Sequence, residues 1–169
     1  MNQKLQLLII GAGPYGLALG LYAQQHKIDY LIVGKIMGFW EHNMPTGMQL
    51  RTPVDWGNDH NLEKPILRED FMAIIRSSIS QKKLRVDNQW VKSVDSIDGN
   101  FSVQMENDET IIAEQVIIAT GYNSYQRIPE EFSKILPKGR YSHNSEHTNF
   151  QNFKGKRCII IGGRQGAFE

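Results

Sequence analysis

The sequence predicts an α/β fold built on a parallel β-sheet. Leu5 to Ile10 form a continuous apolar run, as in a central parallel strand that is covered on both faces. A glycine turn follows, and the residues Pro14–His26 after it have the composition of a helix. Tyr30–Val33 is a second apolar run of strand length. A strand, a glycine turn, a helix and a second strand in this order predict a Rossmann-like fold.

The glycine turn has the spacing G-x-G-x-x-G that is typical of phosphate-binding turns. Gly11 allows the tight turn, Gly13 allows the backbone to approach a pyrophosphate, and Gly16 allows close packing of helix on strand. Pro14 stands in the first turn of the helix, where its missing N–H has no intrahelical partner. The motif alone also fits a glycine turn in another α/β protein, so the assignment of this turn to a dinucleotide depends on the rest of the sequence.

The central part of the chain contains one more helix and a group of strands. Residues 34–64 are rich in Gly, Pro, Asn and Asp and predict a long loop, a type that is usually functional or disordered. Arg68–Lys82 has the apolar stripe of an amphipathic helix. A three-stranded antiparallel β-meander and a second buried parallel strand are expected next, with the meander as a long crossover. The expected strands are Trp90–Ile97, Phe101–Met105 and Thr110–Ala113 for the meander, and Gln115–Ala119 for the parallel strand.

Composition and charge exclude several classes of protein. The 169 residues carry a net charge of +1, which gives no electrostatic reason to expect a nucleic acid or a membrane as partner. The single cysteine, Cys158, excludes an internal disulfide framework and fits a reducing compartment. The apolar run near the N-terminus is too short for a signal peptide or a membrane span. We therefore expect a cytoplasmic protein.

Five segments resemble the flavoproteins with two dinucleotide-binding domains, and within them the flavin-containing monooxygenases and their bacterial relatives. The order of the segments is that of the family, and they cover nearly the whole chain. They are the glycine turn 11–17, Met37-Gly38-Phe39-Trp40 (family G-G-x-W), Leu50-Arg51-Thr52-Pro53 (family L-x-x-T-P), Ala119-Thr120-Gly121-Tyr122 (family A-T-G-Y) and Ser142-His143-Asn144-Ser145-Glu146 (family H-S-S-E linker).

The resemblance implies FAD as cofactor and assigns residues to it. Gly11, Gly13, Pro14 and Gly16 would hold the pyrophosphate; Gly38, Trp40, Arg51 and Thr52 would line the flavin or its phosphates; Val91 would meet the adenine through its backbone; Ala119, Thr120 and Gly121 would pass beneath the flavin. A guanidinium beside a pyrophosphate makes charge-assisted bonds, which supports Arg51, although an exposed arginine is an equal alternative. Hydrophobic packing is the alternative for Trp40.

Two positions depart from the family pattern. These folds normally end the second strand with Asp or Glu, which binds the ribose hydroxyls. Here Val33 is followed by Gly34 and Lys35, and the first carboxylate after them is Glu41. Lys35 would compensate in part by attracting a phosphate. In a second glycine turn near the C-terminus, Arg164 stands where the second glycine is expected.

The C-terminal part predicts a domain boundary. Residues 123–154 are polar and predict a surface linker within an FAD-binding domain of residues 1–154. Arg157–Ile161 predicts a new buried strand, which together with the second glycine turn would open an NAD(P)-binding domain at residues 155–169. Because the sequence stops at Glu169, we expect this domain to be truncated and its first strand to be available for dimerisation.

These observations predict the FAD-binding portion of a flavin-dependent, NAD(P)H-using oxidoreductase of monooxygenase type that acts on a small-molecule substrate. NAD(P)H would act in a complete homologue. The alternative is a truncated nucleotide-binding module without turnover, and a weaker one is an α/β domain that binds a ligand other than FAD. No residue is nominated as catalytic, because none has the setting of a general acid or base, and no metal site is predicted.

Overall fold

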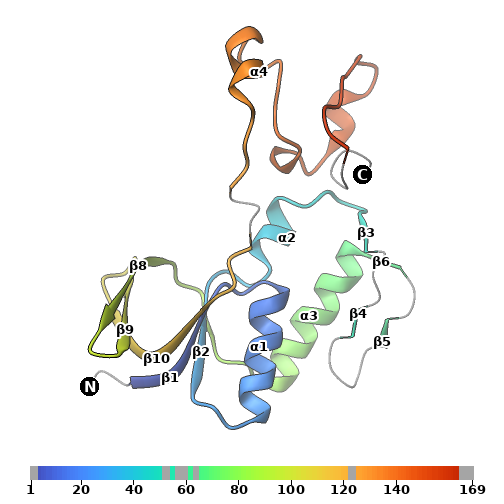
Figure 1. The fold of residues 1–169 in the computed structure, drawn as a ribbon. Coiled ribbons are helices and arrows are strands. Elements are labelled where there is room, and N and C mark those ends of the chain that lie inside the picture. The colour runs from blue at the N-terminus through green and yellow to red at the C-terminus, as the bar shows by residue number, and fades with distance from the viewer. Residues whose placement is uncertain (1–3, 51–53, 56–60, 63–64, 122–124, 164–169) are drawn as a thin grey trace.

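The computed structural model describes residues 4–50, 54–55, 61–62, 65–121 and 125–163. Its centre is a six-stranded sheet with the strand order β7-β2-β1-β10-β9-β8 (Figure 1). The strands are β1 (Lys4–Ile10), β2 (Tyr30–Val33), β7 (Val86–Asp87), β8 (Val91–Ile97), β9 (Asn100–Met105) and β10 (Thr110–Ile118). The first four in the sheet are parallel, and β9 and β8 continue it antiparallel. The predicted α/β, Rossmann-like fold with a β-meander is confirmed.

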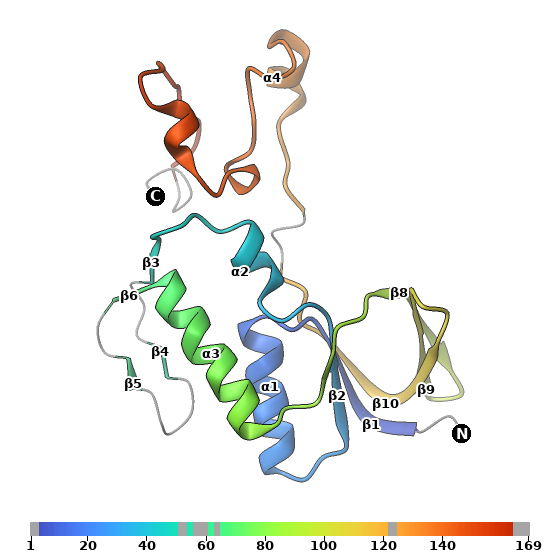
Figure 2. The ribbon, with the colours of Figure 1, turned by 180° about the vertical axis from the view of Figure 1, so that it is seen from behind.

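Two helices cover one face of the parallel strands (Figures 1 and 2). They are α1 (Pro14–Gln25) and α3 (Arg68–Lys82), close to the predicted bounds. Leu17 of α1 and Ile75 of α3 are fully buried and pack in one cluster with Ile9 of β1 and Ile32 of β2. Burial of apolar side chains between helices and sheet is the main stabilising contribution of this layer.

The opposite face is covered by the meander. Val103 and Met105 of β9 are buried in a second cluster that also contains Leu8 of β1 and Val33 of β2. Side chains of β9 therefore pack against side chains of β1 and β2 on this face of the sheet. Because Leu8 and its neighbour Ile9 are both fully buried, β1 is covered on its two faces, as its continuous apolar sequence predicted.

The prediction of two separate strands between residues 110 and 119 is wrong. One strand, β10, runs from Thr110 to Ile118, pairing antiparallel with β9 through its first half and parallel with β1 through most of its length. Glu114 lies between the two predicted strands. In the structure it is exposed and forms an ion pair with Lys4 of β1 at 3.0 Å, and the strand continues through it because the residues on either side pair with β1.

Several short elements complete the fold. The strand β7 extends the parallel sheet beyond β2, and it is too short and polar to show a strand pattern. The long loop contains a short helix, α2 (Gly38–His42), and two small ribbons, which pair β3 (Gln49–Leu50) with β6 (Ile66–Leu67) and β4 (Val54–Asp55) with β5 (Asn61–Leu62).

Residues 125–163 stand apart from the sheet, on the side of the carboxyl ends of the parallel strands (Figures 1 and 2). They contain the helix α4 (Glu130–Ile135) and the 3₁₀ turns η1 (Asn144–Glu146) and η2 (Phe150–Phe153). The prediction of a buried strand at Arg157–Ile161 is wrong, since these residues form no strand and Ile159 is 90% exposed. A strand needs hydrogen-bonded neighbours, and the described residues supply none here.

No helix in the described part of the chain is long and apolar enough to cross a membrane.

A matched pair of glycine substitutions tests this architecture. A Cβ added at Gly16 would lie 1.8 Å from the carbonyl oxygen of Gly11, whereas a Cβ at Gly13 meets nothing within 4 Å. We expect Gly16→Ala to lower the free energy of unfolding by about 1–3 kcal/mol or more. Gly13→Ala should cost less than about 1 kcal/mol, the preference of a helix N-cap for glycine over alanine. Urea unfolding followed by circular dichroism measures both, and equal stabilities would contradict the described turn.

Candidate functional site

The candidate site lies where the carboxyl ends of the parallel strands meet. Along the chain, β2 and β7 are added to the sheet on one side of β1, whereas β10 lies on the other side of β1. The strand order therefore reverses between β1 and β10. Backbone hydrogen bonds join the strand ends at this point: Gly11 donates to Val33 at 2.8 Å and Ala119 donates to Ile10 at 2.7 Å. Ligands of open α/β sheets bind at such reversal points.

The predicted turn glycines Gly11 and Gly16 are required by close contacts between backbones. Gly11 has φ +116°, and a Cβ at this residue would lie 2.4 Å from the carbonyl oxygen of Ala119. Gly16 lies close to Gly11, since a Cβ added at Gly16 would overlap the carbonyl oxygen of Gly11. The first turn of α1 therefore packs closely on the glycine turn that follows β1, and the end of β10 packs closely on the same turn.

Gly13 differs from its two neighbours because it faces open space. It is the N-cap of α1, in extended backbone with φ −81° and ψ −175°, and no side chain caps the helix there. Pro14 occupies the first helical position, as the sequence predicted. The N-terminus of a helix carries a partial positive charge and backbone N–H groups that bind anions. The turn thus offers N–H groups, a positive dipole end and free space for a phosphate.

The end of β2 borders the same turn. Gly34 has φ +134°, and a Cβ there would lie 3.2 Å from the backbone nitrogen of Ala12. Met37 donates its N–H to the carbonyl of Ala12 at 2.9 Å and begins α2 with a left-handed φ of 53°. In the resemblance, Met37 stands at the first glycine of G-G-x-W, and here a residue with a side chain adopts a left-handed conformation at this position.

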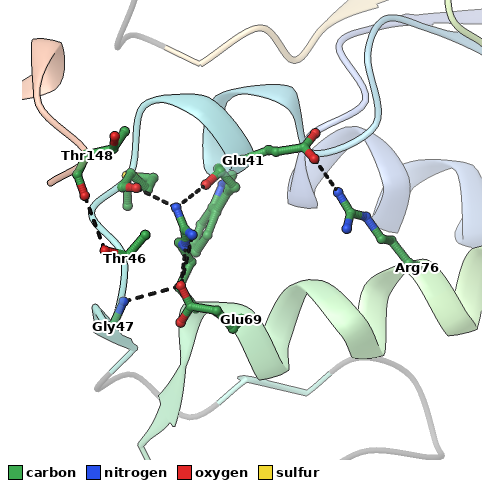
Figure 3. Close-up of polar contacts among 9 residues, drawn as sticks. Glu41, Thr46, Gly47, Glu69, Arg76 and Thr148 are labelled. Carbon is green, nitrogen blue, oxygen red and sulfur yellow. Dashed lines mark hydrogen bonds and ion pairs between the residues drawn. The ribbon is translucent and has the colours of Figure 1, made fainter.

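A buried arginine holds the segment that follows α2. Arg68, at the start of α3, is 7% exposed. Its Nη1 donates to the carbonyl of Trp40 at 3.1 Å and to that of Met44 at 2.5 Å, and its Nη2 lies 2.8 Å from Glu69 Oε1. The same carboxylate oxygen accepts the N–H of Gly47 at 3.2 Å (Figure 3). These contacts fix residues 40–47 against α3.

Two carboxylates of this region have lowered pKa values. Hydrogen bonds from its own backbone N–H and from that of Gly47, with Arg68 beside it, hold the pKa of Glu69 below its usual value. The pKa of Glu41 on α2 is lowered chiefly by its hydrogen bond from Arg76 of α3, at 3.0 Å (Figure 3). Both carboxylates are therefore ionised at neutral pH, and both connect the α2 segment to α3.

The linker is tied to the same segment. Thr46 donates its backbone N–H to the carbonyl of Thr148 at 3.0 Å, and its hydroxyl lies 3.4 Å from the same oxygen (Figure 3). The H-S-S-E-like motif gains a structural explanation as a capping box around η1. The imidazole of His143 accepts the N–H of Ser145 at 3.3 Å, and Glu146 accepts the N–H of His143 at 3.1 Å.

The structure brings most of the predicted site residues together and separates others. Residues 11–16, Lys35, Gly38 and residues 119–121 surround the strand ends, with Thr120 and Gly121 exposed. Trp40 packs on Phe71 of α3 with ring centroids 5.2 Å apart, so the packing alternative for this ring is observed. Val91 lies on the outermost strand, β8, against the cluster that contains Val33. Arg51 and Thr52 lie outside the described residues.

The contacts that organise α2 are not predicted by the sequence. Arg68 looked like an ordinary residue at the start of an amphipathic helix, and its carbonyl partners are 24 and 28 residues away. Glu41 is the first carboxylate after β2 in the sequence, and nothing near it in the sequence points to Arg76 as its partner. No local pattern signals any of the three, because each depends on the packing of α2 on α3.

The comparisons with known proteins agree with this fold. Residues 8–169 match the family model described as pyridine nucleotide-disulphide oxidoreductase. The chain therefore belongs to the pyridine nucleotide-disulphide oxidoreductase family.

Curated relatives include both monooxygenases and reductases. The chain is 26% identical to the probable indole-3-pyruvate monooxygenase YUCCA10 of Arabidopsis thaliana, over 96% of this chain and 47% of that protein. It is 25% identical to the thioredoxin reductase of Dictyostelium discoideum, over 99% of this chain and 53% of that protein. The resemblance to two-domain flavoproteins is thus confirmed. The chain spans about half the length of these relatives.

Solved structures share the fold. A flavin monooxygenase from Stenotrophomonas maltophilia (the Q193R H194T mutant) superposes with a TM-score of 0.81 and 22% identity, over 98% of this chain and 52% of that one. A bacillithiol disulfide reductase from Staphylococcus aureus superposes with a TM-score of 0.63 and 24% identity, over 70% of this chain and 39% of that one. At these identities the likeness establishes the common α/β architecture.

The arginine that holds α2 supplies a test of the site's construction. We expect Arg68→Gln to lower the free energy of unfolding by about 1–3 kcal/mol, because two carbonyls in a poorly solvated position lose their donor. Arg76→Gln is the matched control, since Arg76 is half-exposed and an exposed ion pair such as that with Glu41 contributes little to stability. Urea denaturation of the two variants measures the difference. A larger loss for Arg76→Gln would contradict the assigned role of Arg68.

Proposed function

We propose that this chain forms the FAD-binding portion of a flavin-dependent, NAD(P)H-using oxidoreductase of monooxygenase type. Family membership and the monooxygenases among the relatives support the reaction class. A neighbouring solved structure, described as OTEMO in complex with FAD and NADP, has a TM-score of 0.59 and supports the cofactor pair. The whole protein would act on a small-molecule substrate.

The proposal rests on one observation, the free space beside Gly13. At the other two glycines of the turn, Gly11 and Gly16, backbone atoms occupy the space that a Cβ would take. A ligand that uses this opening approaches the N-terminus of α1 end-on, as the pyrophosphate of FAD does in dinucleotide-binding folds. The residues present fit the pyrophosphate. They do not supply the acid that normally binds the ribose, since the end of β2 carries Gly34 and Lys35.

The roles of the chain's own residues follow from their positions. Gly11 and Gly13 would receive the pyrophosphate, Gly38 and Trp40 would border the cofactor at α2, and residues 119–121 would pass beneath the flavin. Val91 would meet the adenine, and Arg51 and Thr52 would contact the flavin or its phosphates. FAD supplies the redox chemistry when bound, and these residues bind it and orient it. We nominate no catalytic acid or base.

The location and assembly of the protein belong to the same proposal. The single cysteine fits a reducing compartment and so supports a cytoplasmic location. The exposed apolar residues of 159–161 support dimerisation through this segment, because contiguous exposed apolar surface favours association.

FAD binding tests the proposal directly. We expect the purified chain to quench flavin fluorescence on titration with FAD. Gly13→Ala should weaken binding by roughly tenfold or more, about 1.4 kcal/mol, because its methyl group occupies the phosphate approach. The stability of this variant, measured by unfolding, shows that the loss is local.

The outcomes separate the alternatives. Equal affinity of Gly13→Ala and the wild type would contradict the assigned pyrophosphate position, and absence of FAD binding would contradict the proposed function. Added NADPH then distinguishes turnover from simple binding. Bleaching of the bound flavin indicates a working nicotinamide site, and binding without bleaching indicates a nucleotide-binding module.

A further inference from the structure

The helix α2 is bonded to the glycine turn beside the opening at Gly13. The N–H of Met37, at the start of α2, donates to the carbonyl oxygen of Ala12 at 2.9 Å. That oxygen belongs to the peptide group that joins Ala12 to Gly13. Because a peptide group is planar, the hydrogen bond also fixes the direction of the Gly13 N–H. The position of α2 therefore contributes to the orientation of a donor at the opening.

The helix α2 depends on the rest of the protein for its position. It has five residues, and helices of this length are not stable on their own in water. Met37 before it has φ 53°, a left-handed conformation that a residue with a side chain keeps only where the surrounding contacts require it. Its side chain is fully buried in the cluster that contains Phe71 and Ile75 of α3. The contacts with α3 therefore decide where α2 lies.

Arg68 of α3 supplies the buried polar contact with the backbone of α2. Its Nη1 donates to the carbonyl of Trp40 within α2 and to that of Met44 just after it. The guanidinium is oriented by Glu69, whose Oε1 accepts from Nε at 3.0 Å and lies 2.8 Å from Nη2. One buried cation, held by one carboxylate, thus serves two carbonyl groups of the α2 segment.

The first turn of α3 holds Trp40 at two points. Phe71 lies one turn after Arg68 and packs on the ring of Trp40, while Arg68 binds the Trp40 carbonyl. The ion pair of Glu41 with Arg76 also joins α2 to α3, but it is half-exposed, and such pairs contribute little. Loss of the Arg68 guanidinium would therefore remove the main polar contact that fixes the backbone of α2.

We propose that Arg68 is a positioning residue for the cofactor. It holds α2 against the glycine turn, so that the peptide group between Ala12 and Gly13 is oriented for the pyrophosphate before the cofactor binds. The inference rests on the proposed function of the turn as the FAD site. Arg68 acts through α2 and not by contact with the ligand. Without its carbonyl contacts, α2 is correctly placed in only a fraction of the molecules, and the apparent dissociation constant for FAD rises by the inverse of that fraction.

Two variants of Arg68 test this role by FAD titration, under conditions in which circular dichroism shows native secondary structure. Arg68→Met retains an unbranched side chain without a donor, and FAD should bind roughly tenfold or more weakly, as when α2 is placed in about a tenth of the molecules. Arg68→Lys keeps an ammonium donor for the two carbonyls and should stay within about threefold of the wild type. A purely structural role would change the urea midpoint and leave the FAD affinity of the folded protein unchanged.

A second pair of variants changes exposed residues in the first turn of α3. Glu69→Ala removes the carboxylate that orients the guanidinium and accepts the N–H of Gly47 (Figure 3). Asp70→Ala removes the neighbouring carboxylate, which forms no hydrogen bond or ion pair with the residues that the structure describes. FAD should bind roughly threefold or more weakly to Glu69→Ala, and Asp70→Ala should bind it as the wild type does. If Arg68→Met does not fold, this pair decides.

Hydrogen exchange of the variants without FAD gives a readout that does not depend on the cofactor. Amides of residues 41–47 should exchange faster in Arg68→Met and Glu69→Ala than in the wild type. Unchanged exchange there, FAD affinity equal to that of the wild type, failure of Arg68→Lys to restore binding, or an equal loss in Asp70→Ala overturns this inference alone. Absence of FAD binding by the wild type overturns the proposed function and, with it, this inference.

Discussion

The close approach of three backbone segments at the strand ends is the constraint on which the rest of this structure depends. Gly16 allows α1 to pack closely on Gly11, and Gly11 allows the turn to pack closely on the carbonyl group of Ala119. These contacts join the end of the first βα unit to the end of β10, which also pairs parallel with β1 along their length. The same contacts leave Gly13 as the one turn glycine with space before it. The turn is therefore closed on two sides and open on the third, toward the N-terminus of α1.

A second group of interactions supports this opening from outside the turn. Arg68 is buried and holds the carbonyls of Trp40 and Met44, so the segment after α2 is fixed by α3. The linker joins the same segment through the hydrogen bond between Thr46 and Thr148. Residues far apart in sequence thus converge on one short helix. Among these contacts, those of Arg68 are part-buried, so their loss should cost more stability than the loss of a surface ion pair.

Local sequence predicted the turn and the two long helices, because their signals lie within a few neighbouring residues: the glycine spacing, the apolar stripe and the proline at N1. It failed where the outcome depends on distant partners. Glu114 separates the two predicted strands, but β10 continues through it because its backbone pairs with β1 on both sides of this residue. The apolar run at 157–161 looked like a strand, but its residues are exposed and unpaired in the described structure. Arg68 gave no signal because its acceptors lie more than 20 residues away.

Hydrogen–deuterium exchange with and without FAD tests the central claim most directly, because it locates a bound cofactor without any substitution. If the opening at Gly13 is the cofactor site, saturating FAD should slow exchange at residues 11–17 and 34–40, where the turn, α1 and α2 meet. The helix α4 stands apart from this region and should exchange at the same rate in both states (Figure 1). Protection that is absent from residues 11–17 while FAD is bound would contradict the account.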